Sequence, residues 1–276
     1  MGTEQNTQEK LERLKRYFSE LGKVAIAYSS GVDSTFMLKA AHDVLRENAI
    51  AVTAKADVFP KRELEEAEAF CRAEGIRHFV VPVVPLEVEG FAENPPERCY
   101  ICKKAIFDKI VDIANTQGIH CVAEGSNVDD LKDYRPGMKA VHEMGILSPL
   151  REVELTKAEI RILSKDLGLA TWEKPSLACL ASRFAYGETI TEEKLLMVEK
   201  AEQFLLDMGF HQMRVRMHGQ MARIEVAVEE FSFLMEEENR VKILETLRKI
   251  GFIYVTMDLA GYRTGSMNET LSKISL

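Results

Sequence analysis

No stretch of the chain approaches about 18 consecutive apolar residues, the length that marks a membrane-spanning helix, so no membrane association is expected. The amino terminus, MGTEQNTQEKLERLKRYF, lacks the apolar core of a secretory signal, which favours a cytoplasmic protein. An excess of basic residues is also missing, since 36 Lys and Arg stand against 44 Asp and Glu. Nucleic-acid phosphates are held by clustered Lys and Arg, so the net charge of −8 argues against a nucleic-acid partner.

The sequence also lacks internal repeats and low-complexity tracts, so the domain boundary is predicted from the order of helices and strands alone. Its 276 residues correspond to about two domains at roughly 150 residues each. Residues 1–175 alternate helical patterns with short apolar runs, and strands are expected at 24–28, 50–54, 79–83 and 120–123. This alternation predicts an α/β fold with a doubly wound parallel sheet, whose ligand site lies at the carboxyl ends of the strands.

The order of elements changes in the second part of the chain, residues 176–276. A helix, two strands, a helix and a strand are expected at 191–208, 212–217, 221–228, 229–250 and 252–258. This order indicates a second, smaller α+β domain for substrate binding or oligomerisation. Residues 171–190 have little periodicity and contain Pro, Gly and Ser, which predicts a functional loop that connects the two domains.

A turn of small residues links the first predicted strand to its helix. Backbone N–H groups and the helix dipole favour an anion there, and Gly31 lets the main chain approach a phosphate closely. Asp33 would repel a bare phosphate, which predicts a divalent cation, Mg²⁺, beside it. A helix capped by Ser or Asp, without any ligand, would use the same residue types. The residues expected to bind a nucleotide are Ser29, Ser30, Gly31, Asp33, Ser34 and Thr35.

The five cysteines fall into two sets. Cys99 and Cys102 form a CxxC motif at the start of a predicted helix, where a spacing of three places both thiols on one face. Cys179 lies in the irregular connector. Cys71 is predicted on the inner face of a helix and Cys121 in an apolar strand, where a cysteine behaves as a small core residue.

Three cysteines without an obvious fourth leave two kinds of metal site open. Structural zinc takes four protein ligands, so zinc would need a histidine, and His120 or His142 could supply it. A three-cysteine iron–sulfur cluster instead leaves one iron open for an exogenous ligand, as a sulfur carrier requires. The residue types favour the cluster over zinc.

The turn after the first strand resembles the SGGxDS loop of the ATP-pyrophosphatase (PP-loop) superfamily. Ser29, Gly31, Asp33 and Ser34 match that motif, and Ser30 stands where the motif has its first glycine. We expect this departure to be mild, provided that Ser30 keeps a negative φ. The resemblance implies cleavage of ATP between the α- and β-phosphates, with adenylation of a substrate oxygen.

Motifs along nearly the whole chain resemble the LarE family. They are the phosphate loop, Asp133 to Gly137, Cys179 with Ser182 to Phe184 and Tyr186-Gly187, Arg214 to Arg216, and Asp258-Leu259 with Gly261 to Arg263. The resemblance implies an ATP-dependent sulfur transferase of nickel-pincer nucleotide biosynthesis. Such an enzyme adenylates a carboxylate of a pyridinium dicarboxylate mononucleotide and converts it to a thiocarboxylate. The family also forms higher homo-oligomers, which we expect here.

The resemblance also implies a source for the sulfur. Some members sacrifice a single cysteine at the position of Cys179, whereas others hold a [4Fe–4S] cluster with three cysteines and accept sulfide from an external source. Because Cys99 and Cys102 accompany Cys179, we expect the cluster type. Cys179 and Asp33 are then the residues closest to the chemistry.

Two further groups of residues are expected at the site. Arg214 and Arg216 alternate on a strand and share a face, so they could hold the substrate phosphate, with help from Ser182 and Arg183. A solvated strand face or salt bridges would explain the same arginines. Asp130 and Arg135 follow a strand and are expected to orient ATP or the metal, although an ordinary polar loop has the same residue types.

Three other functions compete with sulfur transfer to a small molecule. A tRNA thiolase of the same superfamily is disfavoured by the acidic charge and the lack of a zinc ribbon or basic RNA domain. An ATP-dependent amide synthetase would not need three cysteines at its site. A protein that binds an iron–sulfur cluster or a nucleotide without turnover is the non-enzymatic alternative, and release of pyrophosphate distinguishes it from the enzymes.

Overall fold

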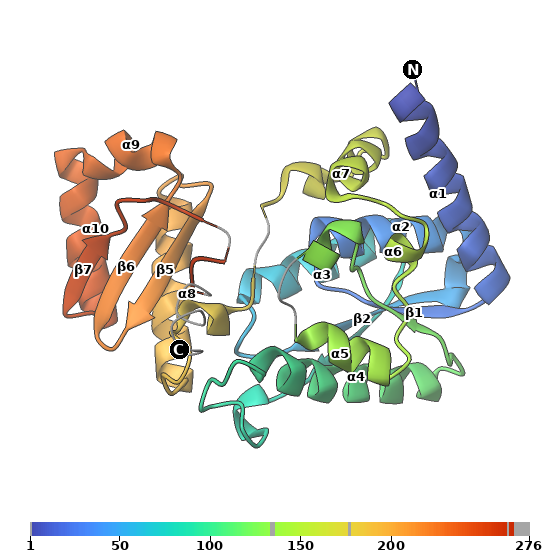
Figure 1. Cartoon of the computed structure of the whole chain (residues 1–276), viewed down its shortest axis with the longest axis horizontal. Helices are drawn as coiled ribbons and strands as arrows, with labels where there is room; N and C mark the ends of the chain where they lie inside the picture. Colours follow the sequence, from blue (N-terminus) through green and yellow to red (C-terminus); the bar gives the residue numbers. More distant parts are fainter. Residues whose placement is uncertain (1, 133–135, 176–177, 264, 268–276) are drawn as a thin grey trace. The chain divides into compact units, whose positions relative to one another are not determined.

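A computed structural model describes residues 2–132, 136–175, 178–263 and 265–267 (Figure 1). The chain forms two compact units, residues 1–84 with 99–177 and residues 85–98 with 178–276. The division between residues 177 and 178 lies close to the expected boundary. Residues 85–98, which the sequence placed in the first domain, cluster with the second unit.

The first unit contains a parallel sheet with the strand order β3-β2-β1-β4. Its strands are β1 Val24–Ala27, β2 Ala49–Lys55, β3 Arg77–Pro82 and β4 Val122–Ala123. Its helices are α1 Gly2–Leu21, α2 Val32–Leu45, α3 Lys61–Glu74, α4 Arg98–Thr116, α5 Gly137–Glu143, α6 Pro149–Glu152 and α7 Lys157–Asp166. Short 3-10 helices are η1 Arg46–Asn48, η3 Val128–Lys132 and η4 Ala170–Glu173.

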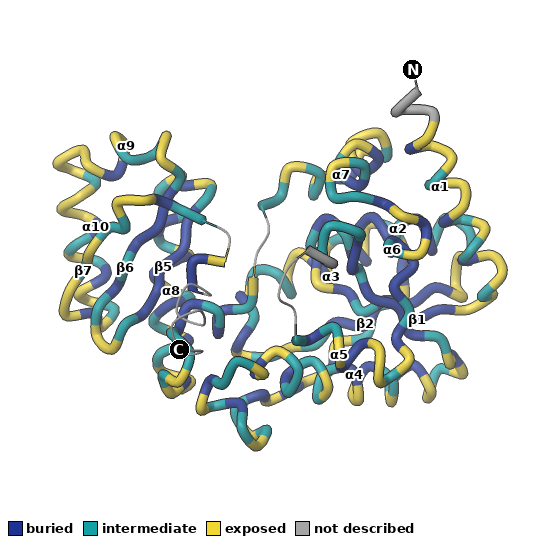
Figure 2. Tube along the Cα trace, viewed as in Figure 1, coloured by how far each residue is buried: buried dark blue, intermediate teal, exposed yellow. Residues whose placement is uncertain are grey.

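Helices cover both faces of this sheet because consecutive strand residues point to opposite sides. Val24 and Ile26 pack into a core with α1, α2, α3 and α7, whereas Ala25 packs into a second core with α4 and α5. The two layers of helices are visible on either side of β1 and β2 (Figure 1), and both strands are largely buried (Figure 2). The prediction of a doubly wound α/β fold is confirmed.

The second unit is built on a three-stranded sheet with the order β5-β6-β7. Strand β6 pairs antiparallel with β5 and parallel with β7. The strands are β5 Met213–His218, β6 Met221–Val226 and β7 Tyr254–Met257, and the helices are α8 Glu192–Asp207, α9 Phe231–Met235 and α10 Glu237–Ile250. The 3-10 helices are η2 Pro85–Glu87, η5 Leu180–Arg183 and η6 Val228–Glu230.

Local sequence explains several boundaries. Thr156 and Glu159 have the sequence spacing that predicts a capping box, and this box begins α7. The prediction of one continuous helix over 229–250 is wrong. Glu236 adopts an extended ψ of 135° and separates α9 from α10. Helices α5 and α6 are too short to show a clear hydrophobic period and were not predicted. In the part of the chain that is described, none of the helices combines the length and apolarity of a membrane span.

Candidate functional site

The turn predicted to bind phosphate, called the phosphate loop below, connects β1 to α2. Gly31 is the N-cap of α2 with a φ of −75°, and a Cβ added there would meet only the Ser29 hydroxyl, at 3.5 Å. The Ser34 hydroxyl donates to the Gly31 carbonyl at 3.2 Å and accepts from the Ser29 N–H at 3.3 Å. The loop is therefore held by its own side chains.

Ser30 departs from the expected backbone conformation. Its φ is +53°, in the left-handed region, so the expectation of a negative φ is wrong. The residue is buried, and both its carbonyl and its hydroxyl accept hydrogen bonds from the Lys174 ammonium, at 2.9 and 3.1 Å. Ser30 thus adopts a backbone conformation that favours glycine, and it is bound by a lysine 144 residues later in the chain.

Asp33, in the first turn of α2, lies among polar groups from two other segments. Its carboxylate pairs with the Lys157 ammonium and accepts a hydrogen bond from the Asn127 amide at 3.2 Å. Burial raises the pKa of Asp33 above its ordinary value, and the Lys157 charge partly offsets this effect. The arrangement places a carboxylate and a cation together at the start of a helix.

The loop after β4 packs directly against the phosphate loop. A Cβ on Gly125 would lie 3.2 Å from the Ser34 backbone nitrogen, so glycine permits this close approach. Asp130 accepts from the Asn127 N–H at 2.9 Å and thereby orders the residue that donates to Asp33. Asp130 therefore lies in a loop that contacts the phosphate loop, whereas Arg135 lies outside the described residues.

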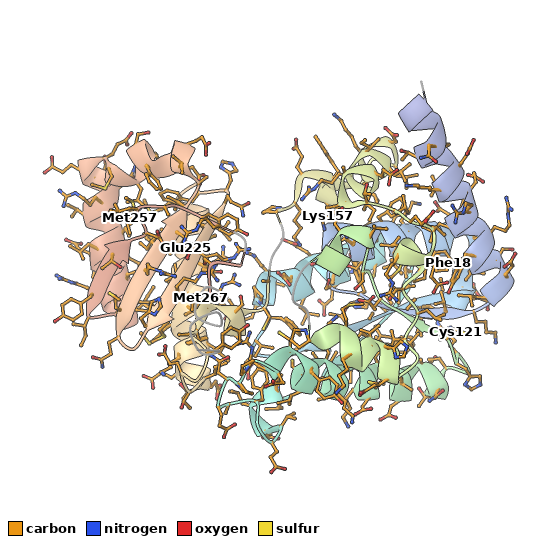
Figure 3. All side chains as sticks on the ribbon, viewed as in Figure 1. Phe18, Cys121, Lys157, Glu225, Met257 and Met267 are labelled. Carbon is orange, nitrogen blue, oxygen red and sulfur yellow. The ribbon has the colours of Figure 1, made fainter. Side chains whose placement is uncertain are left out.

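Lys157 is a functional candidate that the sequence reasoning missed (Figure 3). The capping box of Thr156 begins α7 at Lys157, and the Lys157 N–H donates to an Asp129 carboxylate oxygen at 2.9 Å. Its side chain then reaches Asp33, 124 residues earlier in the chain. The signal available in the sequence was a lysine at the first position of a helix that begins with a capping box.

The cysteines of the expected cluster belong to different units. Cys99 and Cys102 lie in the first turns of α4, the former exposed and the latter buried, and Cys179 is the N-cap of η5 in the second unit. Within the described ranges, no three His, Cys, Asp or Glu side chains gather to hold a metal ion.

Cys71 is buried in the core, as predicted, and burial raises the pKa of its thiol to about 12. Cys121 is half-buried against the same core. The two histidines considered for zinc, His120 and His142, are exposed.

The arginines of β5 are buried, so a solvated strand face is excluded. Arg214 and Arg216 are 3% and 5% exposed. Arg216 forms a salt bridge with Glu225 at 2.9 Å and donates to the Ser182 carbonyl at 3.1 Å (Glu225 is labelled in Figure 3). Burial, followed by the nearby charge of Arg183, lowers the pKa of Arg214.

Arg183 is engaged with its own unit. Its Nε and Nη2 donate to the two oxygens of Glu202, both at 2.8 Å, and neither side chain is appreciably exposed. Its Nη1 donates to the carbonyls of Ala178 and Cys179 and to the Ser182 hydroxyl. Arg183 therefore holds the backbone that carries Cys179.

Relatives of the chain decide its family. No protein-family model matches it. A pyridinium-3,5-bisthiocarboxylic acid mononucleotide synthase from Lactiplantibacillus plantarum is 37% identical over 258 residues, which are 93% of each chain. The chain belongs to the LarE family. An uncharacterized protein of Synechocystis is 43% identical over 264 residues, 96% of this chain and 98% of that one.

More distant relatives place this LarE chain in the PP-loop superfamily. A glutamine-hydrolyzing GMP synthase chain of Methanocaldococcus jannaschii is 28% identical over 207 residues, 70% of this chain and 66% of that one. This match is shorter and has a lower identity than the match to the bisthiocarboxylic acid mononucleotide synthase. The comparisons therefore favour a sulfur transferase over the alternative of an amide synthetase. The resemblance to LarE that the sequence motifs indicated is confirmed.

Proposed function

We propose that this LarE protein is an ATP-dependent sulfur transferase of nickel-pincer nucleotide biosynthesis. Its substrate would be a pyridinium-3,5-dicarboxylate mononucleotide, and its product the corresponding thiocarboxylate. The observation that carries the proposal is the 37% identity, over 93% of the chain, to a synthase named for a bisthiocarboxylic acid mononucleotide. The phosphate loop between β1 and α2 supplies the expected site for ATP.

The first half of the reaction makes the carboxylate reactive. A carboxylate oxygen attacks the α-phosphorus of ATP, the bond to the β-phosphate oxygen breaks, and pyrophosphate leaves. The first N–H groups of α2 and the hydroxyls of Ser29 and Ser34 would bind the phosphates. The Thr35 hydroxyl, which the sequence also predicted for this role, is buried and donates to the Tyr28 hydroxyl instead. Asp33 would hold Mg²⁺, which when bound neutralises charge on the departing pyrophosphate. Lys157, now paired with Asp33, is close enough to contribute a second positive charge.

The second half of the reaction exchanges oxygen for sulfur. Hydrosulfide attacks the acyl carbon of the adenylate, and the bond to the AMP oxygen breaks. The thiocarboxylic acid that forms together with AMP is acidic enough to lose the hydrosulfide proton to water, which gives the thiocarboxylate. The hydrosulfide nucleophile is already anionic, so the scheme requires no general base.

Cys99, Cys102 and Cys179 would hold a [4Fe–4S] cluster, because thiolates are its usual ligands. When bound, the cluster would carry sulfide from an external source on the iron that three thiolates leave open. The hydrogen bonds of Arg183 to the Ala178 and Cys179 carbonyls fix one ligand segment. Cys99 directly follows Arg98, which contacts the Asn94 side chain and stacks on Tyr186.

The substrate phosphate is assigned to the second unit. Arg214 and Arg216 supply buried guanidinium groups on one face of β5. An anion would offset the desolvation of Arg214, whereas Arg216 is already paired with Glu225. Ser182 lies on this side of the unit, since its carbonyl accepts from Arg216. Arg183 supports the phosphate site indirectly, through Ser182, while its other donors are directed to Glu202. Asp130 and Arg135 are retained as candidates for orienting ATP, and a homo-oligomer is expected from the family.

The test combines an assay of products with an analysis of metal content. Anaerobically purified protein with ATP, Mg²⁺, sulfide and the mononucleotide should release pyrophosphate and form thiocarboxylate. It should also carry about four irons and acid-labile sulfide per chain, with absorbance near 400 nm. Cys99→Ala should lose the iron, whereas Cys121→Ala, a half-buried cysteine at the core of the first unit, should keep it. Absence of pyrophosphate release would exclude an ATP-dependent enzyme, and a colourless protein would exclude the cluster.

A further inference from the structure

The conformation of Ser30 requires support from elsewhere in the fold. At a φ of +53° the Cβ of an L-residue crowds the backbone, so a serine occupies this conformation less readily than glycine. Ser30 immediately precedes Gly31, the N-cap of α2. If Ser30 returned to a negative φ, the following peptide would turn and the N–H groups at the start of α2 would point elsewhere.

Lys174 supplies that support. Its ammonium donates to the Ser30 carbonyl at 2.9 Å and to the Ser30 hydroxyl at 3.1 Å, and it forms a salt bridge with Glu66. The lysine side chain is only 13% exposed, so these bonds are well shielded from water. Contacts to both the carbonyl and the side chain of one residue fix the orientation of that residue and not just its position.

The backbone of Lys174 is itself anchored. Arg161, on α7, donates to the Lys174 carbonyl at 2.9 Å and to the Trp172 carbonyl. The same α7 carries Lys157, which reaches Asp33. The segment that follows α7 is thus tied both to its own helix and to the phosphate loop.

We propose that Lys174 is a positioning residue for ATP, which holds Ser30 in the left-handed conformation and thereby aims the N–H groups at the start of α2. The inference rests on the proposed use of ATP at this loop. It explains how a chain with serine in place of the motif's first glycine keeps the loop in a binding geometry. Lys174 acts through Ser30 and does not touch the nucleotide.

The experiment measures the affinity for Mg²⁺ and α,β-methylene ATP, a non-cleavable analogue, by calorimetry. Lys174→Met should weaken binding about tenfold when residue 30 is serine, because a non-glycine residue in the left-handed region is costly. The same substitution introduced into the Ser30→Gly protein should change affinity by less than about twofold, since glycine needs no support. Lys165→Met is the matched control. The Lys165 ammonium lies 4.4 Å from the ring centroid of Trp172, which is on the same segment as Lys174, and its loss should not alter binding.

Each outcome decides the proposal. An unchanged affinity in Lys174→Met contradicts it. An equal loss of affinity with serine and with glycine at position 30 also contradicts it, because the lysine would then act directly on the nucleotide. Thermal unfolding identifies a variant that fails to fold, and Lys174→Ala then replaces Lys174→Met in both backgrounds. Failure of the wild-type protein to bind the analogue would instead refute the proposed function, so the two failures are distinguishable.

Discussion

The phosphate loop of the first unit and the arginine cluster of the second unit, Arg183, Arg214 and Arg216, use positive charge in different ways. In the loop, the Lys157 and Asp33 side chains are 30% and 21% exposed. In the cluster, Arg183 and Glu202 are 0% and 4% exposed, and Arg216 and Glu225 are 6% and 0% exposed. A partly exposed pair can exchange one partner for a ligand at little cost, whereas a buried pair that loses one partner leaves an uncompensated charge. The loop is suited to exchanging a partner for a ligand, whereas the two buried ion pairs are suited to fixing the positions of the arginines around a bound phosphate.

The largest effect is expected in the phosphate loop, on the rate of pyrophosphate release. Asp33→Asn removes the carboxylate proposed to hold Mg²⁺, and should lower the rate constant of pyrophosphate release about a thousandfold. Asp43→Asn is the control, because Asp43 lies on the same helix but pairs with Lys39, away from the loop. Wild-type pyrophosphate release by Asp33→Asn would remove Asp33 from the chemistry.

The next effect is on the stability of the second unit. Glu202→Gln leaves Arg183 buried without its carboxylate and should lower the free energy of unfolding by about 3 kcal/mol, measured in urea. Glu193→Gln, at an exposed position of the same helix, should change it by less than about 0.5 kcal/mol. If the two substitutions had equal effects, the buried pair would not hold the unit together.

The same carboxylate should make stability depend on pH. Burial alone would raise the pKa of Glu202, but Arg183, Arg214 and the Val215 N–H together bring it below its ordinary value of 4.5. A carboxyl with a lowered pKa in the folded state stabilises the fold above about pH 4.5, and this contribution is lost as the pH falls through the folded value.

Unfolding in urea from about pH 6 to about pH 3 measures the effect. The stability difference between wild type and Glu202→Gln should shrink in the acidic part of this range. A difference that is constant with pH would show that Glu202 has no lowered pKa.

The smallest effect concerns the cap of α7, the helix that presents Lys157. Thr156→Ala removes the acceptor of the Glu159 N–H and should lower the free energy of unfolding by about 1 kcal/mol. Thr156→Ser retains the hydroxyl and should stay close to wild type. Thermal unfolding compares the three proteins, and equal stability of all of them would mean that the capping box contributes little.

The fold could be predicted from the sequence where local pattern decides it. Alternating apolar runs and helical periods identified the parallel sheet, and Thr156 with Glu159 identified the start of α7. The short helices α5 and α6 and the break at Glu236 left no periodic signal, because they depend on tertiary packing and on a single ψ angle.

The site was predictable at its motif and less so around it. The SSGVDS turn located the phosphate loop, but the φ of Ser30 depends on Lys174, 144 residues away. The role of Arg183 depends on Glu202, which lies on another helix, so the sequence neighbourhood of Cys179 did not reveal it. The φ of Ser30 and the role of Arg183 depend on contacts between residues far apart in the sequence, which local sequence patterns do not reveal.

We propose above that this LarE protein transfers external sulfide to an adenylated carboxylate and keeps Cys179 as a ligand of the iron–sulfur cluster. The most direct test counts thiocarboxylate molecules formed per chain with ATP, Mg²⁺, the pyridinium dicarboxylate mononucleotide and excess sulfide, followed by mass analysis of the protein. Our account predicts several products per chain and an unchanged mass. Formation of at most one product per chain, with loss of the sulfur of Cys179, would contradict it.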